Sequence, residues 1–229
     1  RLISQNTPYF FTHKVKCLMK NIKNELQNII TGNGQIGDKN LIKTIQDVLR
    51  RNEKSIQISS QNKLVKSEEE IILKHIIEAE DLTYKEEISE SNYISEGAEQ
   101  KVYRLDDKYV IKLNDTIFYA SWKDYFNSLL IHNYFFNSTK YELLGFKIIN
   151  KKIFAVVKQR FVKADETVDL EQLKSFLEFN NFRNVRNNDY QNDELGLIFE
   201  DLHDENVLIN NGILYFIDTI FYLTDNFYK

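Results

Sequence analysis

The spacing of hydrophobic residues changes near residue 91, and the first part of the chain has the spacing of helices. Apolar residues recur there every three or four positions, as on one face of an amphipathic helix, in segments 15–30, 41–49 and 71–77. Ser67 precedes three glutamates and resembles an N-cap followed by an acidic first turn. Arg50, Arg51 and Lys54 are expected to close the second helix. The acidic stretch 78–90 predicts a solvated connector.

Beyond residue 91, short runs rich in β-branched and aromatic residues predict strands. These runs cover 93–103, 109–113, 146–149 and 153–162. Helical spacing returns at 117–136 and 169–181, and the polar segment 182–193 predicts a loop or a short hairpin. The pattern therefore predicts an α+β protein, with a helical region at 1–90 and a second region at 91–229.

A hairpin is predicted near the end of the chain. Asn211-Gly212 separates the apolar runs 207–209 and 213–217, and this dipeptide favours a two-residue type I′ turn because both residues adopt positive φ. Such a turn sets Ile209 opposite Leu214 and Val207 opposite Phe216. Strict alternation would place Glu205 on the face of Asp218, so Asn206 can meet Asp218 only if the ladder ends there and the backbone turns.

Three polar residues flank this hairpin. Asp201 and Asn206 precede it and Asp218 follows it. If the amide of Asn206 and the carboxylate of Asp218 converge, they provide the hard oxygen ligands that Mg²⁺ prefers, together with water and phosphate oxygens. Taken alone, a short acidic motif of this kind is as often an acidic surface loop leading into a hairpin.

The segment Asp201-Leu202-His203-Asp204-Glu205-Asn206, with Asp218 twelve residues further on, resembles a known pattern. It is similar to the catalytic loop and metal-binding aspartate of the protein-kinase and aminoglycoside-phosphotransferase superfamily. The closer similarity, over about 94–223, is to the kinase domain of polyvalent proteins, which occur in bacterial mobile elements and phages. The resemblance implies a minimal two-lobe kinase fold, with an antiparallel β small lobe at 91–162 and a reduced, mostly helical large lobe at 163–229.

The resemblance also implies roles for individual residues. Asp201 would be the catalytic base, Asn206 and Asp218 would bind Mg²⁺, and Lys112 and Gly97 would contact the ATP phosphates. His203 would order the loop. The segment 157–162 corresponds to the hinge that pairs with adenine through its backbone. Taken alone, a lysine in a strand more often faces solvent and one glycine more often marks an ordinary turn.

Several positions depart from the protein-kinase pattern. Phe199-Glu200 stands where His-Arg is usual, and Thr219 follows Asp218 without the usual Phe-Gly. The helix at 117–136 has no glutamate to pair with Lys112, and Asp124 is its only carboxylate before residue 136. Only eleven residues follow Asp218, so either the N-terminal helices complete the large lobe or the acceptor is small.

Composition narrows the classes of function. The formal net charge of −4 argues against a nucleic-acid-binding protein held by bulk charge. Cys17 is the single cysteine, which excludes an intramolecular disulfide and indicates a reducing compartment, and no apolar run approaches membrane-spanning length. We therefore expect a cytoplasmic chain with no membrane or nucleic-acid partner.

The leading hypothesis is an ATP- and Mg²⁺-dependent kinase that phosphorylates Ser, Thr or Tyr of a protein substrate. Two alternatives stay open. One is a small-molecule kinase, and the other is a pseudokinase that binds nucleotide, or only a partner protein, as an interaction module.

Overall fold

The computed structural model describes residues 12–32, 40–60, 66–97 and 100–229, and its contacts group the chain into two compact units. Unit 1 contains α1 (Thr12–Thr31) with residues Leu130–Thr139 and Val162–Lys229, and unit 2 contains the described part of 37–129 with Lys140–Phe161. The chain passes from unit 2 to unit 1 after Phe161, within the stretch expected as the hinge. The division into sequence domains at residue 90 stays a prediction.

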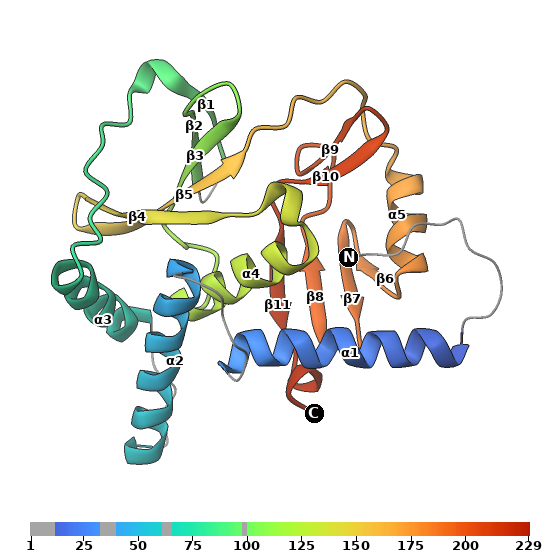
Figure 1. Ribbon diagram of the computed structural model, residues 1–229, viewed down its shortest axis with the longest axis horizontal. Coiled ribbons are helices and arrows are strands. Elements are labelled where there is room, and N and C mark those ends of the chain that lie inside the picture. The colour runs from blue at the N-terminus through green and yellow to red at the C-terminus, as the bar shows by residue number, and fades with distance from the viewer. Residues whose placement is uncertain (1–11, 33–39, 61–65, 98–99) are drawn as a thin grey trace. The chain divides into compact units, whose positions relative to one another are not determined.

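Unit 2 is built on a five-stranded antiparallel sheet (Figure 1). Its order is β1-β2-β3-β5-β4, with β1 at Tyr93–Glu96, β2 at Gln100–Arg104, β3 at Tyr109–Asn114, β5 at Lys152–Arg160 and β4 at Glu142–Ile149. Asn150 and Lys151 both have positive φ in the turn between β4 and β5, as a two-residue hairpin requires. The predicted strands of this region are confirmed, and they include the hairpins β1–β2 and β4–β5.

Helices and a long connector cover the two faces of this sheet. Ile111, Leu113 and Val156 form a buried cluster on one face, against which Tyr84 and Ile88 pack. On the other face, Trp122 and Phe126 of α4 (Trp122–Phe135) contact Phe146 of β4 through their rings. Here α2 (Leu41–Ser60) also contacts β4, and α3 (Lys66–Ala79) contacts α2.

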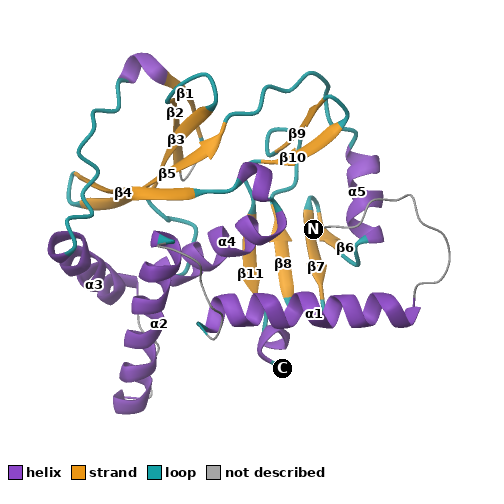
Figure 2. Ribbon diagram, in the orientation of Figure 1, coloured by secondary structure: helices purple, strands orange, loops and turns teal. Residues whose placement is uncertain are grey.

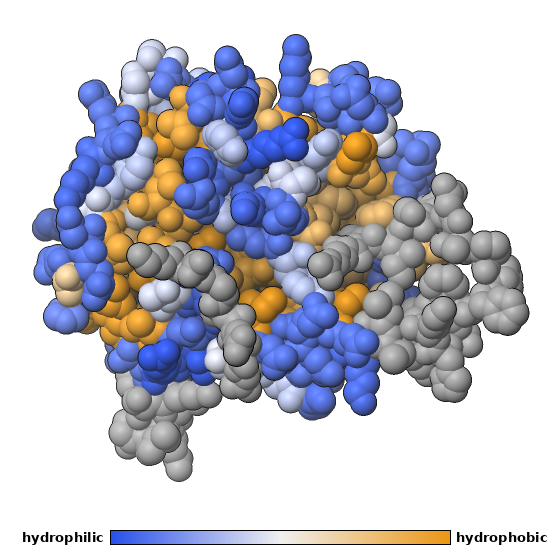
Figure 3. Space-filling view, in the orientation of Figure 1, coloured by the Kyte–Doolittle hydropathy of each residue, from blue (hydrophilic) through white to orange (hydrophobic). Residues whose placement is uncertain are grey.

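The sequence predicted a solvated connector after α3, but part of this connector also pairs with the sheet. Tyr84 N donates to Phe146 O at 2.8 Å, and Phe146 N donates to Leu82 O at 2.9 Å, so the connector pairs with the edge strand β4. This pairing protects backbone groups that an edge strand otherwise exposes. Hydrophobic side chains reach the visible surface over the sheet of unit 2 (Figure 3). At the end of β4, Ile148 and Ile149 are 51% and 41% exposed.

Unit 1 combines helices with two small antiparallel sheets (Figure 2). The four-stranded sheet has the order β11-β8-β7-β6, with β11 at Ile220–Leu223, β8 at Leu197–Glu200, β7 at Asp189–Asn192 and β6 at Arg183–Arg186. The hairpin of β9 (Val207–Asn210) and β10 (Ile213–Phe216) forms the second sheet, and α5 covers Leu170–Phe179 with Asp169 as its N-cap. The region 163–229 thus has more strand than the mostly helical large lobe that the resemblance implied.

A cluster of stacked phenylalanines forms the core of unit 1. Phe136 stacks on Phe216 with ring centroids 4.3 Å apart, and Phe199 stacks on Phe221 at 4.2 Å. These contacts join the chain after α4 to β10, β8 and β11. The short helix η3 (Asp225–Tyr228) then packs against α1, where Lys23 Nζ donates to Asn226 O at 2.7 Å.

The three N-terminal helices are confirmed, although two details differ. The helix α3 begins at Lys66, so Ser67 lies inside it and is not its N-cap. The helix α2 continues to Ser60 beyond the expected basic end, and Arg50 forms an ion pair with Asp47 at 2.9 Å inside the helix. Among the described residues, no helix has the length and apolarity needed to cross a membrane.

Candidate active site

Residues 201–206 form the acidic loop, and the hairpin that follows this loop has the predicted register. Ile209 pairs with Leu214 and Val207 pairs with Phe216, and both turn residues have positive φ, 51° at Asn211 and 70° at Gly212. The ladder ends at Val207, and Ile217 N then donates to Asn206 O at 3.0 Å. The backbone of Asn206 therefore lies beside Ile217, the residue that precedes Asp218 in the sequence.

Asn206 and Asp201 are joined directly. The amide Nδ2 of Asn206 donates to the carboxylate Oδ2 of Asp201 at 2.8 Å and to its main-chain O at 2.9 Å. His203 Nε2 lies 3.2 Å from the other carboxylate oxygen, Oδ1 of Asp201. Asn206 is 8% exposed, whereas the side chain of Asp201 is 52% exposed. The carboxylate is thus fixed by two neighbouring side chains and is still accessible to solvent.

The backbone of Asp201 adopts a left-handed conformation with φ of 66°. Residues other than glycine rarely adopt it, and asparagine and aspartate tolerate it best. Neighbouring bonds support it: Asp201 N donates to Asp189 Oδ1 at 3.2 Å, and His203 N donates to Asp201 O at 3.2 Å. Such strain is characteristic of sites where side-chain position matters more than stability.

His203 organises the loop, as the sequence suggested. Its carbonyl oxygen accepts from Asn206 N and from Val207 N, both at 3.0 Å. Its ring contacts Asp201 and Asn206, the two residues expected to carry chemistry. A change at His203 would therefore disturb both of them.

The atoms that could bind a metal fit Mg²⁺ by their chemistry. Because Nδ2 of Asn206 is directed to Asp201, its Oδ1 is the atom of the amide that can serve as a ligand, and Asp218 adds a carboxylate. Hard oxygen donors of this kind suit Mg²⁺, which keeps several waters or phosphate oxygens in its shell. No group of three or more His, Cys, Asp or Glu residues suited to a metal occurs in the described part of the chain.

Carboxylates crowd the base of this loop. Burial raises the pKa of Glu200, and the neighbouring charges of Asp189 and Asp201 raise it further. Glu200 lies at the end of β8, immediately before Asp201. Added positive charge, such as a metal ion, would relieve this repulsion.

Lys112 and Gly97 lie in unit 2. Lys112 is 3% exposed in the middle of β3, and its Nζ lies 5.4 Å from the ring centroid of Tyr141. Burying an ammonium group is costly without compensating groups, so this lysine does not have the ordinary solvent-facing role. Gly97 follows β1, and its N donates to Gln100 O at 2.9 Å. Among the residues that the structure describes, a Cβ at Gly97 would meet one atom, Gln100 O at 4.0 Å.

The sequence did not predict the contacts of three residues in this region, Asp189, His132 and Thr219. Asp189 supports Asp201 from the β6–β7 hairpin, and Thr219 contacts a histidine from α4. Their distance along the sequence hides these contacts. The position of Thr219 directly after Asp218 was the only available signal.

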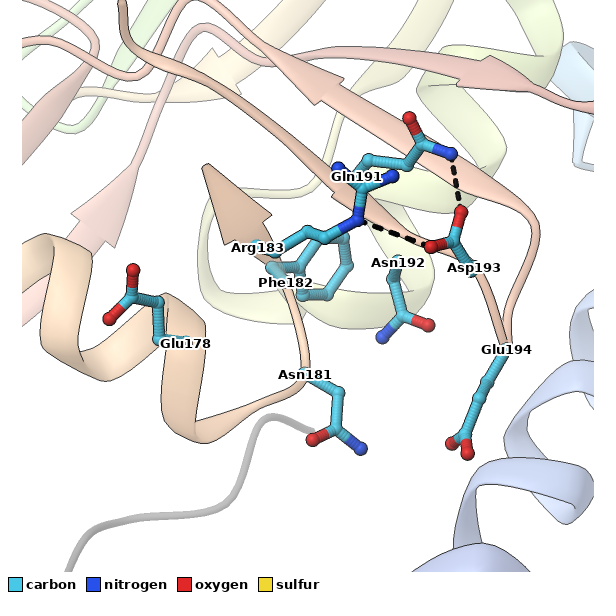
Figure 4. Close-up of a pocket in the computed structure, with 8 residues that line it drawn as sticks. All are labelled: Glu178, Asn181, Phe182, Arg183, Gln191, Asn192, Asp193 and Glu194. Carbon is cyan, nitrogen blue, oxygen red and sulfur yellow. Dashed lines mark hydrogen bonds and ion pairs between the residues drawn. The ribbon is translucent and has the colours of Figure 1, made fainter. Parts of the chain in front are cut away.

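A separate cavity of about 450 Å³ lies between the end of α5 and the β6–β7 hairpin (Figure 4). Among its described lining residues, the one guanidinium, on Arg183, pairs with Asp193, with Nε 3.2 Å from Oδ2. Glu178 and Glu194 also line it. This lining does not favour the phosphates of a nucleotide.

Comparison with known proteins bears on the family of the chain. A search among curated proteins found no match. A family model matches residues 66–225, which is more than half of the chain and includes α3, the whole five-stranded sheet and the acidic loop. Its description is serine/threonine/tyrosine kinase found in polyvalent proteins. The chain therefore belongs to the kinase family of polyvalent proteins.

Proposed function

We propose that the chain transfers the γ-phosphoryl group of ATP to a Ser, Thr or Tyr hydroxyl of a protein, with Asp201 as the base. The observation that carries this proposal is the Asp201 carboxylate, oriented by Asn206 and His203 and half-exposed to solvent. A base must be fixed in direction and still reachable by the hydroxyl group whose proton it takes.

The proposed reaction forms one bond and breaks another. The acceptor oxygen bonds to the γ-phosphorus, the bond from that phosphorus to the bridging oxygen of ADP breaks, and the hydroxyl proton passes to the carboxylate of Asp201. Asn206 Oδ1 and the Asp218 carboxylate would hold Mg²⁺, which would neutralise charge on the phosphates. In unit 2, we assign the ammonium of Lys112 and the backbone at Gly97 to the phosphates.

A transfer assay with radiolabelled ATP and Mg²⁺ tests this proposal. We expect wild-type protein to label itself or a generic protein substrate, and Asp201→Asn to lower the rate at least ~100-fold, since a general base contributes about that much. Asp204→Asn is the matched control, because Asp204 lies in the same loop with its side chain 59% exposed. We expect it to retain activity.

Other outcomes would contradict the proposal in different ways. Undiminished transfer by Asp201→Asn would remove Asp201 from its role. A thermal shift with ATP that needs Mg²⁺, without transfer by the wild type, would indicate a nucleotide-binding interaction module. Transfer to small alcohols but not to proteins would indicate a small-molecule kinase.

A further inference from the structure

His132 lies at the centre of a buried hydrogen-bond chain in unit 1. Its Nδ1 is 2.7 Å from Thr219 Oγ1, and its Nε2 is 2.9 Å from Thr139 O. Thr139 Oγ1 in turn donates to Phe216 O at 2.6 Å. His132 and Thr139 are fully buried, and Thr219 is 4% exposed. The chain thus joins the end of α4 and the helix η2 (Asn137–Thr139) to the segment 216–219.

Hydrogen-bond chemistry fixes the direction of this chain. A main-chain oxygen can only accept, so Nε2 of His132 donates to Thr139 O. In the neutral imidazole Nδ1 is then the acceptor, and the hydroxyl of Thr219 donates to it. Thr139 has its own hydroxyl hydrogen directed to Phe216 O. In this hydrogen-bond chain, each buried donor therefore has an acceptor and each buried acceptor has a donor.

The two residues that this hydrogen-bond chain holds, Phe216 and Thr219, lie on either side of Asp218 in the sequence. Phe216 is held through its carbonyl oxygen and Thr219 through its hydroxyl group. Stacking of Phe216 on Phe136 holds the same segment from the apolar side. On the other strand, Ile217 N donates to Asn206 O, which ties the segment to the acidic loop. Little freedom remains for the backbone that carries Asp218.

We propose that His132 and Thr219 are positioning residues that fix the backbone of residues 216–219 and thereby the carboxylate of Asp218. This inference rests on the proposed function for its catalytic consequence. The hydrogen-bond chain itself is a property of the protein without ligand. Neither residue needs to touch a substrate.

Thr219→Val and Thr219→Ser form the matched pair that tests this inference. Valine has the shape of threonine without the hydroxyl group, and serine keeps the hydroxyl group. Hydrogen exchange of the ligand-free protein is the first measurement. We expect Thr219→Val to speed exchange of the Ile217 amide, which donates to Asn206 O, at least ~10-fold, and Thr219→Ser to stay near wild type. Equal exchange in all three proteins would overturn the inference.

The Mg²⁺ dependence of phosphoryl transfer is the second measurement, made well below the melting temperature of each variant. We expect Thr219→Val to need ~10-fold more Mg²⁺ for half-maximal rate, with the Mg²⁺ requirement of Thr219→Ser unchanged. Faster exchange with an unchanged Mg²⁺ requirement would overturn the positioning role. If the wild type shows no transfer, the proposed function fails, and the exchange data still decide whether the segment is held as inferred.

Discussion

At the scale of single residues, Asp201 combines a strained backbone with a carboxylate that is fixed in direction. The left-handed φ of 66° costs on the order of 1 kcal/mol for a residue with a Cβ, and the bonds from Asn206 and to Asp189 offset it. The contacts with Asn206 and His203 fix the direction of the carboxylate. The strain is therefore consistent with selection for the direction of this side chain.

Replacing Asp201 with glycine or alanine measures that strain. Both substitutions remove the carboxylate, but only glycine relieves the left-handed backbone. We expect Asp201→Gly to be about 1 kcal/mol more stable than Asp201→Ala in chemical denaturation. Asp204 has no positive φ, so the order should reverse there. The same order at both positions would mean that Asp201 is not strained.

Gly145 provides a second test of local geometry. It has φ of 142°, and a Cβ there would lie 2.5 Å from Leu82 O, where the connector pairs with β4. We expect Gly145→Ala to cost about 1–3 kcal/mol, as overpacking does. Gly97→Ala is the control, with an expected change within about 0.5 kcal/mol. A comparable loss at both positions, measured by denaturation, would contradict the close approach at Gly145.

At the scale of elements, α3 supports the start of α4 through Glu69. Glu69 is 2% exposed, and its carboxylate accepts from Trp122 N at 2.6 Å and from Lys123 N at 3.4 Å. These are backbone groups that the first turn of a helix leaves unpaired. Burial raises the pKa of Glu69 to about 7, against these bonds, which lower it. One helix thus provides the cap of another from a distance in sequence.

The raised pKa makes stability depend on pH. The unfolded value is 4.5 and the folded value is about 7, so the favourable contribution of protonated Glu69 is complete below pH 4.5 and is lost as pH rises to about 7. Glu69→Gln removes this dependence. Relative to it, we expect the wild-type free energy of unfolding to fall by roughly 3 kcal/mol between pH 4.5 and pH 8.

Chemical denaturation at several pH values measures this effect. The exposed Glu68 of the same helix provides the control variant, Glu68→Gln. A constant difference between wild type and Glu69→Gln across this pH range would show that folding does not raise the pKa of Glu69.

Local patterns predicted the elements better than they predicted the partners of those elements. The turn chemistry of Asn211-Gly212 was sufficient to give the register of β9 and β10, because a two-residue loop leaves one pairing. The pairing of β11 with β8 could not be foreseen, since it joins segments that no short turn connects. For the same reason the capping role of Glu69 and the contacts of His132 were hidden. Sequence spacing does not encode which distant surfaces pack together.

At the scale of the whole molecule, the matched family region is smaller than the folded protein. The helix α1 lies outside residues 66–225, yet it belongs to unit 1 and bonds to η3 through Lys23 and Gln27. Its apolar face, including Leu26 and Ile30, is buried. The N-terminal helix α1 therefore adds to the unit that carries the acidic loop.

Truncating Leu26 tests this contribution. Leu26 is fully buried, so we expect Leu26→Ala to lower the free energy of unfolding by about 2–5 kcal/mol. The exposed Lys20 on the same helix is the control, and Lys20→Ala should change stability by less than about 0.5 kcal/mol. Thermal or chemical denaturation measures both. A loss at Leu26 no larger than at Lys20 would mean that α1 is not part of the stable core.

A structure of the protein with Mg²⁺ and a non-hydrolysable ATP analogue tests the central claim most directly. We expect the cation ~2.1 Å from both Asn206 Oδ1 and a carboxylate oxygen of Asp218, with the γ-phosphate facing Asp201. A nucleotide bound without either ligand at the cation, or bound away from this loop, would contradict the assignment of residues 201–218 as a phosphoryl-transfer site.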